Sequence, residues 1–99
     1  MVFMTLQEFK QTFSQPEPPA SVDTLLQAMW HDGKGNWEAA HNLAQDVETD
    51  LGSWVHAYLH RKEGDTGNAS YWYHRAHRKM PSYALQQEWD EITSYFLSH

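Results

Sequence analysis

The residue types that could do chemistry gather in the middle of the chain. His56 and His60 are four residues apart, and Glu63 follows His60 by three residues. If this stretch is helical, the spacing places two imidazoles and one carboxylate on one face of the helix. These groups are ligands for a divalent metal such as zinc, manganese or iron. The cluster, completed by His31 or His41 from an earlier helix, is therefore a candidate metal site.

Two other interpretations of these histidines remain open. In one, each imidazole packs in the core and donates a hydrogen bond to a backbone carbonyl, to Tyr73 or to Glu63. In the other, a histidine is a general base in a small-molecule pocket, and Arg61 or Arg75 holds an anion. The chain has neither a His-Glu-x-x-His string nor paired Glu-x-x-His motifs, so the spacing does not distinguish the metal site from these two interpretations. No cofactor other than a divalent metal is predicted.

Composition narrows the classes of function. The chain has 99 residues and no cysteine, which suits one domain without disulfides or thiolate metal sites. Its formal net charge of −6 is opposite in sign to that of most nucleic-acid-binding domains, so a nucleic-acid partner is not expected. The first ten residues do not read as a signal peptide, and no stretch is apolar enough to span a bilayer. We therefore expect a cytoplasmic protein without a membrane segment.

The elements that must position these residues all have helical patterns. Apolar residues recur at spacings of three and four, and the prolines of residues 15–19 and the glycine turns interrupt them. Thr5 and Glu8 have the spacing of a capping box. The sequence predicts an all-α fold, a compact bundle of about six short helices in one domain. Its expected parts are an N-terminal helix in residues 1–14, helical hairpins over 22–48 and 50–78, and a C-terminal helix over 82–97, within a single domain of residues 1–99.

The two predicted hairpins are alike in sequence. A shift of 29 residues aligns four identical pairs, which are Ala28 with Ala57, His31 with His60, Gly35 with Gly64, and Ala40 with Ala69. Each pair falls at a matched place in the helix, turn, helix pattern. The hairpins are therefore predicted to be two copies of one unit, and Gly64 should adopt a left-handed conformation at the end of the first helix of the second copy.

The second hairpin also carries a spaced motif. Its residues are Gly64, Asp65, Ala69, Tyr73, Ala76 and Pro81. This spacing resembles the second half of a tetratricopeptide or Sel1-like repeat, and the resemblance extends over residues 22–82. The strings HAYLHRKEGD and NASYWYHRA are also similar to small bacterial proteins, a resemblance that implies no activity. In tetratricopeptide-like packing the first helices of the hairpins line a groove, which here would comprise Leu25, Met29, Trp54, Tyr58, Arg61 and Lys62.

The resemblance implies a module that binds a protein, a peptide or a small ligand in this groove. Arg61 and Lys62 would suit an acidic partner. Because two hairpins make a short groove, self-association that extends the stack is also expected. The alternative is a small metal- or histidine-dependent enzyme that uses the histidine and glutamate cluster, and the sequence does not decide whether there is catalysis.

Overall fold

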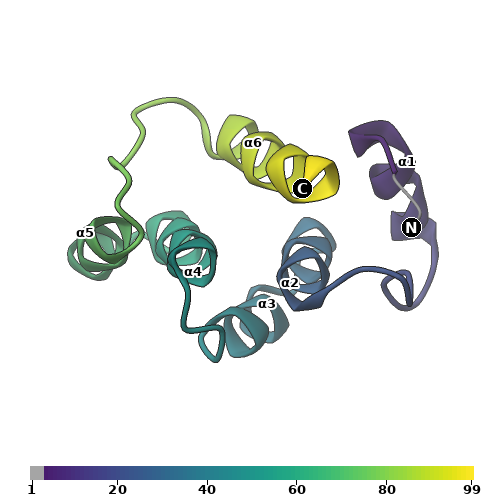
Figure 1. Cartoon of the computed structure of the whole chain (residues 1–99), viewed down its shortest axis with the longest axis horizontal. Helices are drawn as coiled ribbons and strands as arrows, with labels where there is room; N and C mark the ends of the chain where they lie inside the picture. Colours follow the sequence, from purple (N-terminus) through teal and green to yellow (C-terminus); the bar gives the residue numbers. More distant parts are fainter. Residues whose placement is uncertain (1–3) are drawn as a thin grey trace.

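A computed structural model describes residues 4–99 as a bundle of six α-helices (Figure 1). The helices are α1 (Leu6–Gln11), α2 (Thr24–Gly33), α3 (Trp37–Ala44), α4 (Asp50–Lys62), α5 (Thr66–Arg75) and α6 (Leu85–Ser98), and a 3₁₀ turn, η1 (Thr12–Ser14), follows α1. No strand occurs in residues 4–99, which confirms the predicted all-α class. The radius of gyration is 12.6 Å, close to the value of about 13 Å for a compact domain of 100 residues. None of the helices in this range is both long and apolar enough to cross a membrane.

Side chains cap the N-termini of five of these helices. The Thr5 hydroxyl accepts the Glu8 N–H at 3.1 Å, and the Glu8 carboxylate accepts the Thr5 N–H at 2.9 Å, so the predicted capping box is confirmed. The side chains that cap α2, α3, α4 and α5 in turn are Asp23, Asn36, Thr49 and Asp65. Each cap pairs a backbone N–H that would otherwise lack a partner and contributes about 1 kcal/mol.

The two hairpins turn in the same way. In the second hairpin the Gly64 N–H donates to the Arg61 carbonyl at 3.1 Å, and the Asp65 N–H donates to the His60 carbonyl at 2.9 Å. The first hairpin repeats both bonds 29 residues earlier, from Gly35 to Asp32 and from Asn36 to His31. Both glycines are left-handed, with φ of +88° and +89°. This is the Schellman motif, so the 29-residue register of the sequence is also a register of backbone hydrogen bonds.

Helix α4 is the centre of the bundle. Within the hairpins α2 packs on α3 and α4 packs on α5, and α4 also contacts α2, α3 and α6. Figure 1 shows α6 lying over α2 and α4, on the side away from α3, with α1 beside it. The helices that would line a tetratricopeptide-like groove are therefore covered by the C-terminal helix of the same chain.

The core lies between α6 and the two hairpins. Its large buried apolar side chains are Phe9, Met29, Trp30, Trp54, Leu59, Trp89 and Ile92. Full burial of a side chain of this size contributes roughly 1.5 to 3 kcal/mol. Helix α6 begins at Leu85 rather than near residue 82, because Ala84 before it has an extended backbone (φ −61°, ψ 148°). The Trp89 indole then fixes α6 to α2 by donating to the Met29 carbonyl at 3.0 Å.

Replacing Gly64 with alanine tests the left-handed turn. A Cβ at Gly64 would meet no atom within 4 Å, so its cost comes only from holding an L-residue at φ +89°, about 1 to 2 kcal/mol. Gly67 in α5 has equal space for a Cβ but no left-handed backbone. Gly67→Ala is therefore the control and should stabilise by about 0.5 to 1 kcal/mol. Urea denaturation measures both, and equal unfolding free energies in the two variants would contradict the assigned turn.

Candidate metal centre

The structure brings three histidines together from two helices. His41 lies on α3, and His56 and His60 lie on α4. One ring nitrogen of each lies within 4.8 Å of the other two, and the Nε2 atoms of His41 and His56 are 3.0 Å apart. Two imidazole nitrogens bound to one tetrahedral zinc ion are about 3.3 Å apart. The three rings are therefore close to the arrangement in which they share an ion.

Glu63 orients one of these rings. Helix α4 ends at Lys62 and Glu63 is its C-cap, so the Glu63 carboxylate returns to the last turn, where it lies 2.6 Å from His60 Nδ1. This bond uses Nδ1 and leaves Nε2 free for a metal. Metal-bound histidines usually donate their second ring N–H to a carboxylate or carbonyl in this way. Glu63 therefore lies where a carboxylate outside the coordination sphere would hydrogen-bond His60 and orient its ring.

A second group of potential ligands shares His60. Ligand atoms of His60, Glu63 and Asp65 also lie within 4.8 Å of one another. Both acids are exposed, and Asp65 already caps α5 and accepts a side-chain hydrogen bond from Asn68 at 2.8 Å. The cluster of His41 with α4 is the better candidate, because its groups are more buried and do not also serve as helix caps.

Two tryptophans enclose the histidine cluster. The Trp37 ring stacks on His41 with centroids 4.9 Å apart, and the Trp72 ring of α5 stacks on His56 at 4.1 Å. The Trp37 indole also donates to the Leu59 carbonyl at 2.7 Å, which fixes α3 to α4. The sequence analysis did not identify either tryptophan as part of the site. For Trp37 the available signal was its spacing from His41, which is i to i+4 on one helix.

The cluster favours neutral imidazoles. Burial, followed by the charges of His41 and His60, lowers the pKa of His56 to about 4. Burial and His60 also lower the pKa of His41, against an opposing effect of Glu63. Both rings are therefore uncharged at pH 7, and the neutral imidazole is the form that binds a metal.

His31, nominated with the others, lies outside the cluster. Its ring packs edge-on against Trp30, with centroids 5.2 Å apart, and it belongs to neither group of potential ligands found within residues 4–99. In the 29-residue register it matches His60, but Lys34 stands where the second hairpin has Glu63. The first hairpin therefore lacks the acid that would orient its histidine.

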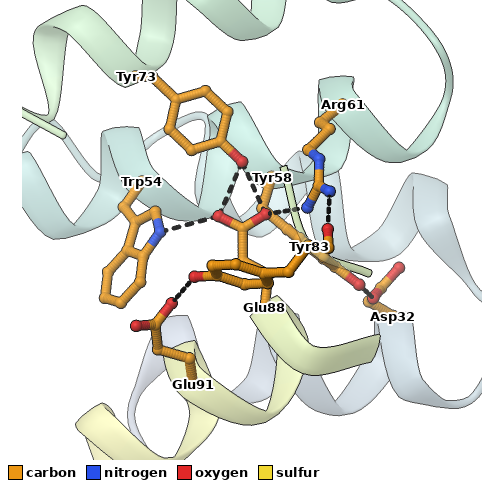
Figure 2. A network of polar contacts seen from close by, with 8 residues as sticks. All are labelled: Asp32, Trp54, Tyr58, Arg61, Tyr73, Tyr83, Glu88 and Glu91. Atoms are coloured by element: carbon orange, nitrogen blue, oxygen red, sulfur yellow. Dashed lines mark hydrogen bonds and ion pairs between the residues drawn. The ribbon is translucent and has the colours of Figure 1, made fainter. Parts of the chain in front are cut away.

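Most of the residues predicted to line a ligand groove are buried inside the bundle. Four of them have exposed fractions of 8% or less, and these are Leu25, Met29, Trp54 and Tyr58. The two cations, Arg61 and Lys62, are paired with carboxylates of the same chain. Internal contacts therefore take up part of this surface, some of them shown in Figure 2, and open pockets lined in part by Trp54 and by Tyr58 with Lys62 remain beside them.

Glu88 of α6 is the acceptor at the centre of these contacts. Its side chain is 1% exposed and accepts from the Trp54 indole at 3.2 Å and from Arg61 at 2.8 Å, while the Tyr73 hydroxyl lies 2.7 Å from both carboxylate oxygens (Figure 2). Arg61 also donates to the Tyr83 carbonyl. Burial, with the Glu88 carboxylate as the next cause, raises the pKa of Tyr73, so its hydroxyl stays protonated and donates. The acidic group that Arg61 was expected to receive from a partner comes from α6.

Asp32 plays a similar part on α2. It is 2% exposed and accepts from the Tyr58 hydroxyl at 2.8 Å and from Lys62 at 2.9 Å. Burial and the Asp32 charge raise the pKa of Tyr58, which therefore acts as a donor. The buried role of this acid was not predicted, although Asp32 follows Met29 by three residues and so shares its helix face.

Removing the Glu88 carboxylate tests the internal network. Glu88→Ala would leave Arg61 without its buried partner, and we expect the unfolding free energy to fall by about 3 to 5 kcal/mol. Glu91 lies on the same helix but is exposed, and within residues 4–99 its side chain accepts a hydrogen bond only from the Tyr83 hydroxyl, so Glu91→Ala should cost less than about 1 kcal/mol. Chemical denaturation compares the two. Similar losses in both variants would show that the network is not a major support of the fold.

The lowered pKa of His56 predicts a loss of stability in acid. Between about pH 6.5 and pH 4 the unfolded chain binds a proton at His56 that the folded chain does not, so the unfolding free energy falls as the pH falls through this window. The expected loss is on the order of 2 kcal/mol. Denaturation of metal-free protein in chelator at several pH values measures it. His56→Gln should flatten this part of the curve, and an unchanged slope would contradict the assignment to His56.

A scan against protein-family models, a search of curated proteins and a search of solved structures found no match to this chain. The resemblance to tetratricopeptide and Sel1-like repeats therefore stays a prediction from the sequence.

Proposed function

We propose that this protein binds one divalent transition-metal ion through His41, His56 and His60. The observation that carries the proposal is the convergence of three ring nitrogens within 4.8 Å, one of them on an imidazole already oriented by Glu63. Neutral imidazoles suit zinc and its neighbours in the first transition row, whereas magnesium and calcium prefer oxygen ligands. Zinc fits best, because its usual tetrahedral geometry accepts three histidines and one further ligand.

The fourth position determines what such a centre could do. Three protein ligands leave one coordination site for water or for a small molecule, as in catalytic zinc sites, whereas structural sites are closed by four. His41 is only half-buried, so its side of the cluster is the side that solvent can reach. The proposal is therefore a metal centre that can take an outside ligand, and it includes no assigned reaction.

Recognition of a protein, peptide or small ligand in the groove stays a prediction. Helix α6 covers the first helices of both hairpins, so a partner would have to displace α6 or use another surface. The expected self-association depended on an exposed apolar groove. Among the large apolar side chains described, Tyr71, at 52%, is the one that is exposed, and it lies on α5, which is not one of the two groove helices. The geometry therefore favours the metal centre over the groove.

Metal titration of protein purified without a histidine tag and stripped with chelator tests the proposal. We expect one Zn²⁺ or Co²⁺ per chain by calorimetry, and the visible absorption of tetrahedral Co²⁺. His41→Ala and His60→Ala should each weaken binding at least about a hundredfold, because each removes a ligand. His74→Ala is the control, since His74 is exposed on α5 and lies outside the cluster.

Glu63→Gln separates a metal site from adventitious binding to surface histidines. It keeps the three imidazoles but weakens the bond that orients His60, so we expect one ion per chain with an affinity about 10- to 100-fold lower. A protein that binds no ion, or one whose affinity is the same in His41→Ala and His74→Ala, would refute the proposed function.

A further inference from the structure

A small cavity lies beside the histidine cluster. Its volume is about 110 Å³, and its wall includes His56, Trp72, Ser53, Arg75 and Glu48. These residues come from the α3–α4 connection, the first turns of α4, and α5. The space holds a few heavy atoms, well below the roughly 300 to 1,000 Å³ of sites for drug-sized ligands. It could therefore admit only a small molecule or ion.

One ring nitrogen of His56 has no hydrogen-bond partner among residues 4–99. Its Nε2 faces Nε2 of His41, so Nδ1 is the atom available to the cavity that the ring lines. When Nε2 binds a metal, Nδ1 must carry the ring proton and becomes a donor. Metal-bound histidines normally give this proton to an acceptor. Glu63 is that acceptor for His60, and His56 lacks an equivalent.

The net charge around the cavity changes from neutral to positive when the metal binds. Without metal, the wall has one cation, Arg75, and one anion, Glu48. A divalent ion on three neutral imidazoles adds two positive charges behind His56. The N-terminal turn of α4, which contributes Gly52 and Ser53 to the wall, adds partial positive charge. The metal-loaded cavity is therefore positive and should attract an anion.

Arg75 is held at the rim of this cavity. Its guanidinium donates to the Tyr71 hydroxyl at 3.1 Å and lies 5.4 Å from the centre of the Trp72 ring. Trp72 in turn stacks on His56. The planar guanidinium leaves further N–H groups free, and these can donate in pairs to a carboxylate or phosphate.

We propose that the metal-loaded protein binds a small oxyanion in this cavity, between the Nδ1–H of His56 and the guanidinium of Arg75. The inference rests on the proposed metal centre and adds its ligand class, which is a compact carboxylate or tetrahedral oxyanion. The anion acts as the outer partner of His56, as Glu63 does for His60. It stabilises the metal-bound form of the ring, so metal and anion bind cooperatively, and each raises the affinity of the other by the same factor.

The test measures Co²⁺ affinity by calorimetry in chloride buffer and again with sulfate or formate added at constant ionic strength. We expect either oxyanion to lower the Kd for Co²⁺ about tenfold, because it would accept a hydrogen bond from Nδ1–H of the metal-bound His56. Arg75→Gln should bring the ratio of the two Kd values close to one. Lys79→Gln, which removes an exposed cation of the α5–α6 connection outside this cavity, should keep the wild-type ratio.

The outcomes separate the two proposals. Co²⁺ binding with the same Kd in chloride, sulfate and formate would overturn the oxyanion site and leave the metal centre standing. An oxyanion effect that persists in Arg75→Gln would also overturn it, because the anion would then be bound elsewhere, for example directly on the metal. If the wild-type protein binds no Co²⁺, the metal centre fails, and the oxyanion site fails with it.

Discussion

The fold depends on the burial of α4 on more than one side. This helix contacts α2, α3, α5 and α6, and its buried residues include two histidines and a tyrosine as well as apolar side chains. Buried polar groups cost free energy unless they are paired. On the side of α6 and α2 the partners are the carboxylates of Glu88 and Asp32. On the side of α3 and α5 the partners are His41, Glu63 and the two tryptophan rings. The packing of α2, α3, α5 and α6 therefore has to supply partners for the polar side chains of α4 as well as apolar contacts.

Local features of the sequence were enough to predict the hairpins. The capping box and the turn glycines act within a few positions of the residues they pair with, and the structure confirms the box of Thr5 and Glu8 and the left-handed Gly64. The docking of α6 is different, because Glu88 bonds Trp54 across 34 residues. No local sequence pattern predicts which distant side chains will donate hydrogen bonds to a carboxylate. The spacing of Glu88, three residues after Leu85 and four before Ile92, placed it on the apolar face, and that signal was available.

The histidine cluster was predictable in one helix and ambiguous between helices. The spacing of His56 and His60 determines that they share a face of α4. The choice between His31 and His41 as the third member could not be made from the sequence, because it depends on which helix of the first hairpin meets that face. The structure shows that α3 does, through the bond from Trp37 to the Leu59 carbonyl. Sequence symmetry pointed toward His31, since it matches His60, but contacts between the hairpins do not follow that symmetry.

The cluster around Glu88 and the histidine cluster differ in how many of their polar atoms have hydrogen-bond partners. Around Glu88 every group has a partner, since the indole, the phenol and the guanidinium all donate to one carboxylate (Figure 2). Such a network explains stability and requires no ligand. In the histidine cluster Nδ1 of His56 and Nε2 of His60 have no hydrogen-bond partner in residues 4–99, and neither atom is fully enclosed, so water or a ligand can reach both. A chain that needed only packing there would lose little with apolar residues of similar volume. The two open nitrogens, rather than the number of histidines, are what the proposed metal centre rests on.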